Sequence, residues 1–395
     1  MDTVTLLKGK DKAARQRHPW IFSGALADTG RRPDSGDIVQ VNDHSGAFVA
    51  YGMYNDRSRV AVRLLEWDAD RVPDENWWRE RIRQALAVRR PLRESSDTDA
   101  MRLIFAEADF LPGLIVDQYA DYISVQLHAA GVARLKPLLI DELTEQLQPK
   151  GIYERSDPQA LAHEGLPLTN GLLSGDPPPE WVAVREHGIR YAVNIVSGQK
   201  SGFYCDQREN RQLTAQYAQG KRVLDCFCYS GGFSLHALAH GAASVISVDS
   251  SELAIEALDR NLTLNGFDRS RHQAIKGDVQ KQLRMFADSG ERFDLIILDP
   301  PKYAPTRATL EKASRAYKDL NRRALLLLGA GGLLATFSCS AAMDLATFKQ
   351  VLAWAALDAG KDIQFIGQFN QPEDHPVRSS FPEGEYLKGL LCRVM

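Results

Sequence analysis

From about residue 195 to the C-terminal end, short apolar runs alternate with stretches whose apolar positions recur at helical spacing. Runs of this length are typical of buried strands, and the stretches between them predict amphipathic helices. Strands that alternate with helices predict an α/β fold, with a mostly parallel, doubly wound sheet and helices on both faces. The expected strands are residues 223–227, 244–248, 273–278, 293–299 and 332–338.

The first 70 residues follow a different pattern. Three valine-rich runs are separated by Asp, Asn, Gly and Ser, which predicts a small β-rich unit closed as a barrel. The runs are residues 37–41, 47–51 and 59–64.

The middle of the chain predicts an α+β connecting domain. Residues 76–92 predict one helix that Pro91 ends, and residues 181–195 predict a β-hairpin that turns at His187 and Gly188. The other expected elements are strands at 102–107, 113–117, 122–127 and 151–154 and a helix at 133–147. We therefore expect three domains, at residues 1–70, 71–190 and 191–395.

Composition narrows the class of protein. With 395 residues, 44% of them hydrophobic, the chain is long enough for two or three domains. It has no apolar run long enough to predict a membrane span, and its charged start is unlike a signal peptide. Five cysteines without C-x-x-C pairs argue against disulfides and zinc and favour a reducing, cytoplasmic location without a metal. A net charge of −3 gives no overall signature of nucleic-acid binding.

Residues 223–249 carry the most informative chemistry. A strand, a tight turn through Ser230, Gly231 and Gly232, a helix and a second strand ending at Asp249 predict the opening half of a nucleotide-binding sheet. The glycines allow close approach of a ligand, and the acid can accept two ribose hydroxyls. Because G-x-G-x-x-G is absent, the turn suits a cofactor without a pyrophosphate, such as S-adenosyl-L-methionine. The alternative is an ordinary strand–helix–strand unit.

Ligands of open α/β sheets bind outside the carboxyl ends of the strands, and acids stand at several of these ends. Asp225 and the Ser-Gly-Gly turn are expected beside the amino-acid part of the cofactor. Asp249 is expected at the ribose, and Asp278 at the amino group of adenine. Any one of these acids alone would more often be a helix cap or a solvated turn.

The fourth strand runs into Asp299, Pro300, Pro301, Lys302 and Tyr303. Two prolines stiffen the exit and leave backbone carbonyls without a ladder partner, so they can hold the amino group of a planar base while an aromatic neighbour stacks on it. The alternative is a sheet-edge strand that proline stops.

Cys339 follows the fifth strand and is the candidate nucleophile. C5 of a pyrimidine takes a methyl group only after a thiolate has added to C6, and a nearby acid can protonate N3 as it adds. The alternative is a buried structural cysteine. Cys226, Cys228 and Cys392 are expected to be packing residues, and Cys205 is undecided.

Near the N-terminus, Trp20 and Phe22 follow the basic stretch that contains Lys10. Aromatic side chains beside Lys and Arg suit looped RNA, by stacking and phosphate contact. The alternative is that Trp20 and Phe22 form the core of the barrel.

Two resemblances extend these inferences. The N-terminal stretch, above all SGDIVQV, resembles the PUA domain, an RNA-binding pseudobarrel. Nearly the whole chain resembles the bacterial 23S ribosomal RNA cytosine-C5 methyltransferases of the large-subunit methyltransferase I family, which have three parts ending in a class I methyltransferase domain. The matching pieces are GQKSGFYCDQRENR, DCFCYSGGFSLHALAHGA, VDSSELAIEALDRN, LDPPKYA, ATFSCS and DHPVRSSFPEGEYLKG.

The resemblance implies methyl transfer from S-adenosyl-L-methionine to C5 of one cytosine in 23S rRNA, naked or in an assembling subunit. A homodimer stays open, because a PUA-like barrel often meets a partner surface. It implies Cys339 as the nucleophile, Asp299 at the base-binding turn, and Asp249 and Asp278 as cofactor acids. It also implies that residues 199–208, with Phe203 among them, close over the methionine end of the cofactor, where Arg208 is a partner for the carboxylate.

The chain departs from the wider RNA cytosine-C5 group at one position. Many of those enzymes have a second cysteine after the proline of the fourth strand, where this chain has Lys302 and Tyr303. The base that removes the C5 proton is therefore unassigned, with Lys302 and His375 as candidates. Two alternative functions stay open, namely methylation of an exocyclic base nitrogen, which needs no thiol, and a non-catalytic RNA-binding assembly factor.

Overall fold

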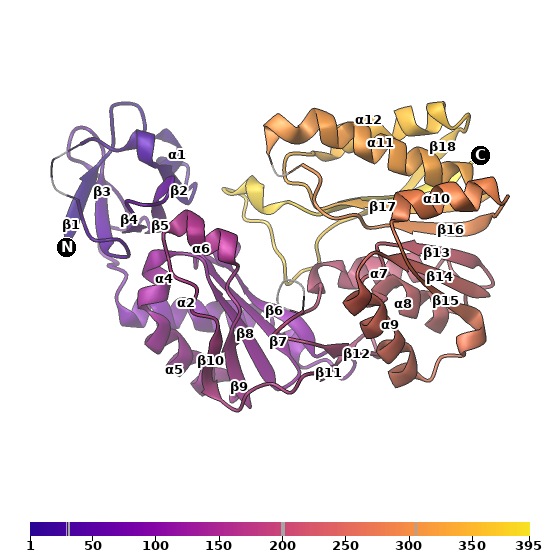
Figure 1. The fold of residues 1–395 in the computed structure, drawn as a ribbon. Helices are drawn as coiled ribbons and strands as arrows, with labels where there is room; N and C mark the ends of the chain where they lie inside the picture. The colour runs from indigo at the N-terminus through magenta and orange to yellow at the C-terminus, as the bar shows by residue number, and fades with distance from the viewer. Residues whose placement is uncertain (29, 31, 199–201, 305) are drawn as a thin grey trace. The chain divides into compact units, whose positions relative to one another are not determined.

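The computed structural model describes residues 1–395 except 29, 31, 199–201 and 305 (Figure 1). The chain divides into two compact units. The first comprises Met1–Arg185, Val193–Cys205 and Glu373–Gly384, and the second comprises Glu186–Ala192, Asp206–Pro372 and Glu385–Met395. The boundary falls within the predicted hairpin, now β11 (Val182–Glu186) and β12 (Ile189–Val193). The division into three domains stays a prediction.

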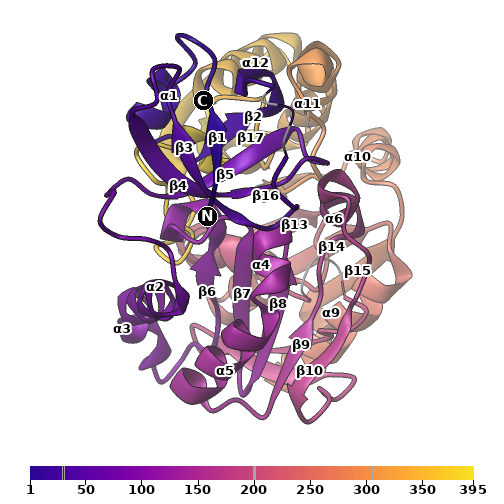
Figure 2. The same ribbon diagram turned by 90° about the vertical axis from the view of Figure 1, so that its left-hand side faces the viewer.

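The first unit begins with a five-stranded sheet of order β1-β3-β4-β5-β2 (Figure 2). The three valine-rich runs form β3, β4 and β5, as predicted, and the strand at Trp20 adds one edge. Val39, Val41, Val62 and Leu64 lie in its core, fully buried. The elements are β1 (Asp2–Thr5), α1 (Lys12–Arg15), β2 (Trp20–Phe22), β3 (Ile38–Asn42), β4 (Phe48–Tyr54) and β5 (Val60–Glu66).

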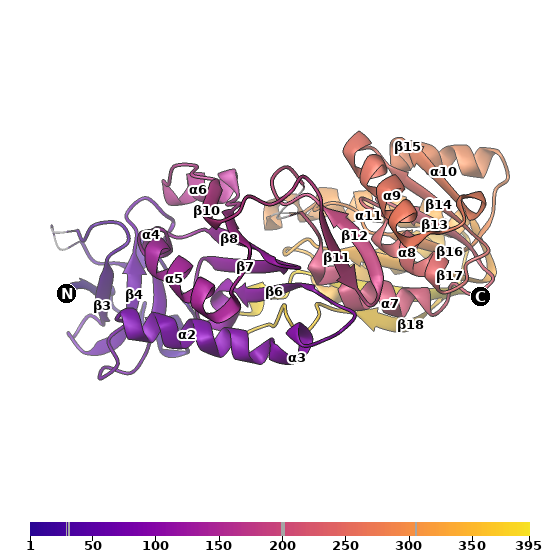
Figure 3. The same cartoon turned by 90° about the horizontal axis from the view of Figure 1, so that it is seen from below.

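A second five-stranded sheet of the first unit has the order β10-β9-β8-β7-β6. Helices α2 and α5 pack on it, with Trp78, Ile82 and Leu139 in the shared core (Figure 3). The elements are α2 (Glu75–Val88), α3 (Arg90–Arg93), β6 (Ala100–Phe105), β7 (Leu114–Tyr119), β8 (Tyr122–Leu127), α4 (Ala130–Arg134), α5 (Lys136–Leu147), β9 (Gly151–Glu154), α6 (Pro158–Glu164) and β10 (Gly171–Gly175).

Two helix predictions are wrong in this part of the chain. The single helix expected over residues 76–92 is α2 followed by α3, and Pro91 lies in the first turn of α3 instead of ending a helix. The helix expected over 133–147 is likewise two helices, with a proline in the first turn of α5. Proline is tolerated in a first turn because its missing N–H has no partner there, so it begins these helices.

The second unit contains a seven-stranded sheet of order β15-β14-β13-β16-β17-β19-β18. Helices α7, α8 and α9 lie on one face, and α10, α11 and α12 lie on the other (Figure 1). The elements are α7 (Arg208–Ala215), β13 (Arg222–Cys226), α8 (Gly232–Ala239), β14 (Ser244–Asp249), α9 (Glu252–Asn265), β15 (His272–Lys276), α10 (Val279–Asp288), β16 (Phe293–Leu298), α11 (Leu310–Leu326), β17 (Leu328–Ser338), α12 (Leu345–Asp358), β18 (Ile363–Phe369) and β19 (Lys388–Val394).

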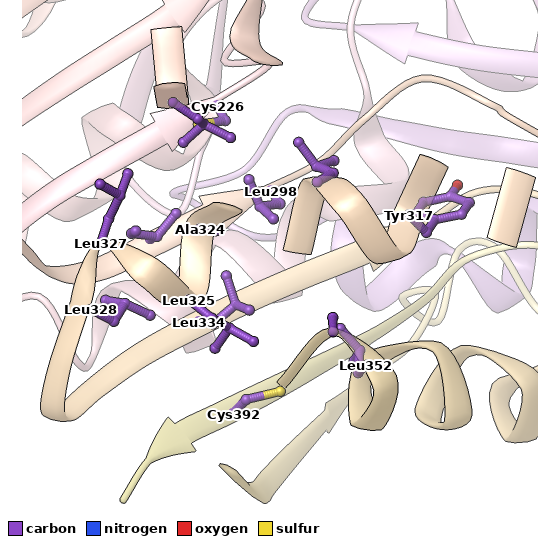
Figure 4. Packing of buried hydrophobic residues seen from close by; sticks show 14 of the residues in the cluster. Cys226, Leu298, Tyr317, Ala324, Leu325, Leu327, Leu328, Leu334, Leu352 and Cys392 are labelled. Atoms are coloured by element: carbon purple, nitrogen blue, oxygen red, sulfur yellow. The ribbon is translucent and has the colours of Figure 1, made fainter. Parts of the chain in front are cut away.

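The predicted mostly parallel sheet with helices on both faces is confirmed. Strands β13 to β17 are parallel, whereas β19 runs antiparallel to both β17 and β18. Leu298, Tyr317, Leu334 and Leu352 belong to the core between the sheet and its covering helices (Figure 4).

The register of the sheet determines where the functional side chains gather. Cys226 of β13 pairs with Leu298 of β16, and Leu298 pairs with Thr336 of β17. Asp299 and Cys339 therefore leave the sheet at the same edge as the turn after β13. None of the helices in the described ranges is both long and apolar enough to cross a membrane.

A candidate active site at the carboxyl edge of the large sheet

Asp225 is a fully buried carboxylate near the end of β13. Its Oδ2 atom accepts hydrogen bonds from the backbone N–H of Ser234 at 3.0 Å and from the hydroxyl of Ser234 at 2.6 Å. Its Oδ1 atom is buried and has no hydrogen-bond partner among the described residues. Burial raises the pKa of Asp225 to about 7, and the negative charges of Asp299 and Asp249 act in the same direction. A buried acceptor without a partner is where a ligand's donor group would bind.

The turn after β13 has an unusual backbone. Phe227 and Tyr229 adopt positive φ angles of 62° and 47°, and Gly231 has a φ of 83°. Bulky residues rarely adopt such angles, and strain of this kind concentrates at functional sites. The backbone N–H of Tyr229 donates to Oδ2 of Asp249 at 2.9 Å, which ties the turn to the end of the neighbouring strand.

The two glycines of the turn are required by the protein's own packing. A Cβ atom on Gly231 would lie 2.2 Å from Cδ1 of Leu258, and one on Gly232 would lie 2.7 Å from Cδ of Arg211. The sequence interpretation attributed these glycines to close approach of a ligand. The structure adds a second reason, the close packing of Leu258 and Arg211, which applies even when no ligand is bound.

Ser230 is buried, and its carbonyl accepts from Nδ2 of Asn261 at 2.9 Å. Asn261 is fully buried in α9 and was not singled out from the sequence.

Asp249 and Asp278 both hold backbone N–H groups. Oδ1 of Asp249 accepts from Ser251 at 2.9 Å, so both of its oxygens are engaged, although each retains a lone pair. Asp278 is exposed and caps α10 by accepting from the backbone N–H of Lys281 at 2.8 Å. The helix-cap alternative therefore describes Asp278, and a role at adenine stays a prediction.

Cys339 is half-buried, whereas the other four cysteines, Cys205 included, are buried. The residues on either side of it, Ser338 and Ser340, are fully buried. The Ser338 hydroxyl donates to the hydroxyl of Tyr317 at 3.0 Å, and Tyr317 lies 3.1 Å from the Ser340 hydroxyl. Burial raises the pKa of Tyr317 to about 12, so it is neutral and can both donate and accept. Tyr317, missed in the sequence, thus clamps the loop that carries Cys339.

The turn after β16 lies against this loop. The backbone N–H of Ala304 donates to the Ser340 hydroxyl at 3.0 Å, and the ring of Tyr303 lies 4.9 Å from that of Tyr317. Burial raises the pKa of Tyr303 to about 12. Lys302 is exposed, and Asp299 is half-buried.

The two prolines of this turn differ in exposure. Pro300 is buried, and its carbonyl faces the thiol of Cys339. Pro301 is exposed, and the role of both prolines at a substrate base stays a prediction.

The sequence also indicated Arg208 and residues around it. Arg208 is fully buried at the start of α7, and its Nε donates to Glu209 at 3.0 Å. Residues 199–201 lie outside the described residues. Phe203 is buried and belongs to the first unit. Their roles at the cofactor stay predictions.

The remaining candidates also belong to the first unit. His375 is buried, with Nδ1 3.2 Å from Oδ1 of Asp374, unlike the exposed surface position that is usual for a lone histidine in a loop. Trp20 is half-buried, and its indole N–H donates to Glu107 at 2.8 Å. Phe22 and Lys10 are exposed. No group of three or more His, Cys, Asp or Glu within the described ranges is placed to hold a metal ion.

Comparison with known proteins gives a consistent assignment. The chain matches the family of S-adenosylmethionine-dependent methyltransferases over residues 156–392 and the PUA-like domain over residues 4–67. It is 42% identical over 393 residues to "Ribosomal RNA large subunit methyltransferase I" of Aliivibrio fischeri, with 100% of this chain and 99% of the relative covered. The protein of the same name from Escherichia coli O139:H28 is 41% identical over 392 residues, with 99% of both chains covered.

Solved structures share the fold over the full length. A methyltransferase from Streptococcus mutans, described as dependent on S-adenosylmethionine, superposes with a TM-score of 0.85 at 21% identity and covers 100% of both chains. A methyltransferase in complex with SAH superposes with a TM-score of 0.87 at 21% identity, again over 100% of both chains.

Proposed function

Because the chain belongs to the ribosomal RNA large subunit methyltransferase I family, we propose that it methylates C5 of one cytosine in 23S ribosomal RNA. The observation that carries this proposal is the position of Cys339. It is the one half-exposed cysteine, it lies at the carboxyl edge of the sheet, and it faces the turn that begins with Asp299. Methylation of an exocyclic nitrogen needs no thiol at this position.

S-adenosyl-L-methionine fits the residues at this edge and supplies an electrophilic methyl group. Oδ1 of Asp225 is a buried acceptor without a partner, which suits the ammonium of the methionine part. Asp249 retains lone pairs for ribose hydroxyls, and Asp278 retains its exposed oxygen for the adenine amine. Arg208 is the candidate for the carboxylate.

The chain's own residues then prepare the cytosine. The thiolate of Cys339 adds to C6, and the electron pair of the C5–C6 double bond becomes available at C5 as N3 takes a proton from Asp299. C5 takes the methyl group with this pair, and the electrons of the broken S–CH3 bond would stay on the cofactor's sulfur. N3 returns its proton to Asp299, loss of the C5 proton to a base restores the C5–C6 double bond, and the thiolate leaves C6. Lys302, in the same unit as Cys339, and His375 stay the candidates for that base.

The residues proposed to contact RNA come from distant parts of the sequence. Pro301, Tyr303, Trp20 and Lys10 are proposed to contact RNA, because they offer flat or cationic groups that suit bases and phosphates. Whether the enzyme acts on naked 23S rRNA or on an assembling large subunit is a question for the experiment.

The test uses 23S rRNA and large-subunit particles from a strain that lacks this gene. Each is incubated with methyl-labelled S-adenosyl-L-methionine and the wild type, Cys339→Ala or the control Cys392→Ala, and the labelled nucleoside is identified. We expect 5-methylcytidine from the wild type and the control only. Equal activity from Cys339→Ala, or label in N4-methylcytidine, would reject the thiolate mechanism. Bound cofactor without any label in either substrate would reject 23S rRNA as the target.

A further inference from the structure

A buried lysine lies beside the loop of Cys339. Lys388, the first residue of β19, is 4% exposed, and it pairs in the sheet with Ser338. Its Nζ donates to the backbone carbonyls of Ser340 at 2.9 Å and Met343 at 2.7 Å. Among the described residues, no carboxylate lies within ion-pair distance of Nζ. A lysine buried in this way is uncommon unless its charge is paired, which asks for an explanation.

The charged groups that face Lys388 give that explanation. They are Cys339, Glu385 and Asp344, whose negative charges favour the ammonium, and Lys302, whose positive charge opposes it. Burial lowers the pKa of Lys388, and among the charges Cys339 acts most strongly in the other direction. Attraction between two charges is mutual, so an ammonium that a thiolate stabilises also stabilises that thiolate.

We propose that Lys388 is a positioning residue that holds Cys339 as a thiolate and, through the carbonyls of Ser340 and Met343, fixes the loop that carries it. This inference rests on the proposed function, in which the thiolate of Cys339 attacks C6. Lys388 keeps its own proton throughout, and the proton of the thiol goes to solvent. Lys388 contacts no reacting atom, so its effect on the reaction passes through Cys339.

The alternative cation is Lys302, which the sequence indicated only as a candidate base. Lys302 is exposed, and water screens a charge there much more effectively than it screens one in the interior. A neutral thiol is a weak nucleophile, and an ordinary cysteine is mostly protonated at neutral pH. A buried cation beside the thiol is the usual way in which proteins overcome this.

The test is the pH profile of Cys339 alkylation by iodoacetamide in the full-length protein. Because the other four cysteines are buried, the signal is selective, and Cys339→Ala gives the background. We expect the wild-type midpoint to lie below the ordinary value for cysteine, which is about 8.5. Lys388→Gln, which can still donate to a carbonyl, should raise the midpoint by about one pH unit or more. Lys388→Arg should largely restore it.

Lys318→Gln is the control, since Lys318 lies on α11 and its Nζ pairs with Asp358 at 2.7 Å instead of with carbonyls of the loop. Its midpoint should equal that of the wild type. A wild-type midpoint at or above about 8.5 overturns the proposal even if no Lys388 variant folds. An unchanged midpoint in a folded Lys388→Gln overturns it as well.

Methyl transfer provides the second readout. Lys388→Gln should lose about tenfold in rate near pH 7 and recover part of that loss at higher pH, with cofactor affinity unchanged. A purely structural role would lower the rate equally at every pH. Alkylation does not depend on methylation, so failure of the proposed function, seen as full activity in Cys339→Ala, is distinguishable from failure of this inference.

Discussion

The Sγ atom of Cys339 lies 4.0 Å from the backbone carbonyl oxygen of Pro300. The contact favours the neutral thiol, because a thiolate cannot donate to a carbonyl and is repelled by it. A hydrogen bond of this kind contributes at most about 1 kcal/mol. Two opposite unit charges about 4 Å apart attract by about 4 kcal/mol at an effective dielectric constant of about 20, so an ammonium at that distance would outweigh the contact.

Tyr317→Phe tests how far the clamp on this loop matters. The change removes the hydroxyl shared by Ser338 and Ser340 but keeps the ring between Tyr303 and Phe348. We expect a fall in kcat of about tenfold, from a misplaced thiol, and a loss of about 1–2 kcal/mol in the free energy of unfolding. Cofactor affinity should be unchanged. Steady-state kinetics measures kcat, calorimetric titration measures cofactor affinity, and urea unfolding measures the stability. An unchanged kcat would contradict the clamp.

Gly231→Ala tests why the turn after β13 needs glycine. Gly231 combines a positive φ with a clash against Leu258, whereas Gly266, which caps α9, has a φ of 63° and open space around its Cβ position. We expect Gly266→Ala to cost about 1 kcal/mol of stability from φ alone. Gly231→Ala should cost about 1–3 kcal/mol more and weaken cofactor binding. Equal melting temperatures for the two variants would contradict the packing argument.

Strand ends were the part of the site that could be predicted from the sequence. Apolar runs bounded by turns located the carboxyl ends of these strands within one or two residues, although β17 begins four residues before its predicted start. Parallel strands bring their carboxyl ends to one edge, so Asp225 and Cys339 followed from local pattern alone. The Ser-Gly-Gly turn followed in the same way. These inferences need only neighbours in sequence.

The missed residues depend on tertiary contacts. Tyr317 is an ordinary aromatic position in an amphipathic helix until β17 brings Ser338 and Ser340 against it. Lys388 looks like a surface lysine before an apolar run, and only the antiparallel pairing of β19 with β17 buries it. The split of the helices at Pro91 was missed because the same residue can end one helix or begin another.

Arg89→Ala tests the buried ion pair that anchors the C-terminal segment of the first unit. Arg89 is bidentate to Asp109, at 2.6 and 2.8 Å, and also donates to the carbonyl of Asp374 at 3.2 Å. Removing it leaves the carboxylate of Asp109, whose side chain is 9% exposed, with no cation and only the backbone N–H of Phe105, so we expect a loss of about 3 kcal/mol in urea unfolding. Its neighbour Arg90 pairs with Glu94 at the surface, and Arg90→Ala should leave the midpoint unchanged. Equal losses of stability in Arg89→Ala and Arg90→Ala would contradict this difference between the interior and the surface ion pair.

Asp225 predicts a pH dependence of cofactor binding. Its pKa is about 7 in the free protein, above the ordinary value of 3.8, so it is largely protonated below pH 6. A cofactor ammonium favours the ionised carboxylate, so affinity should rise about five- to tenfold from pH 6 to pH 7.5, with release of a proton on binding below pH 7.

The same shift has the opposite sign for the stability of the free protein. A carboxyl whose pKa is raised from 3.8 to about 7 on folding contributes stability that is fully present below pH 3.8, declines as pH rises from there and is lost above about pH 7. Bound cofactor should reverse this trend, because it pairs with the ionised form. Titration calorimetry in buffers of different ionisation enthalpy measures the released proton, and Asp225→Asn should abolish both the release and the pH dependence. A wild-type affinity that is flat between pH 6 and pH 7.5 would place the cofactor ammonium elsewhere.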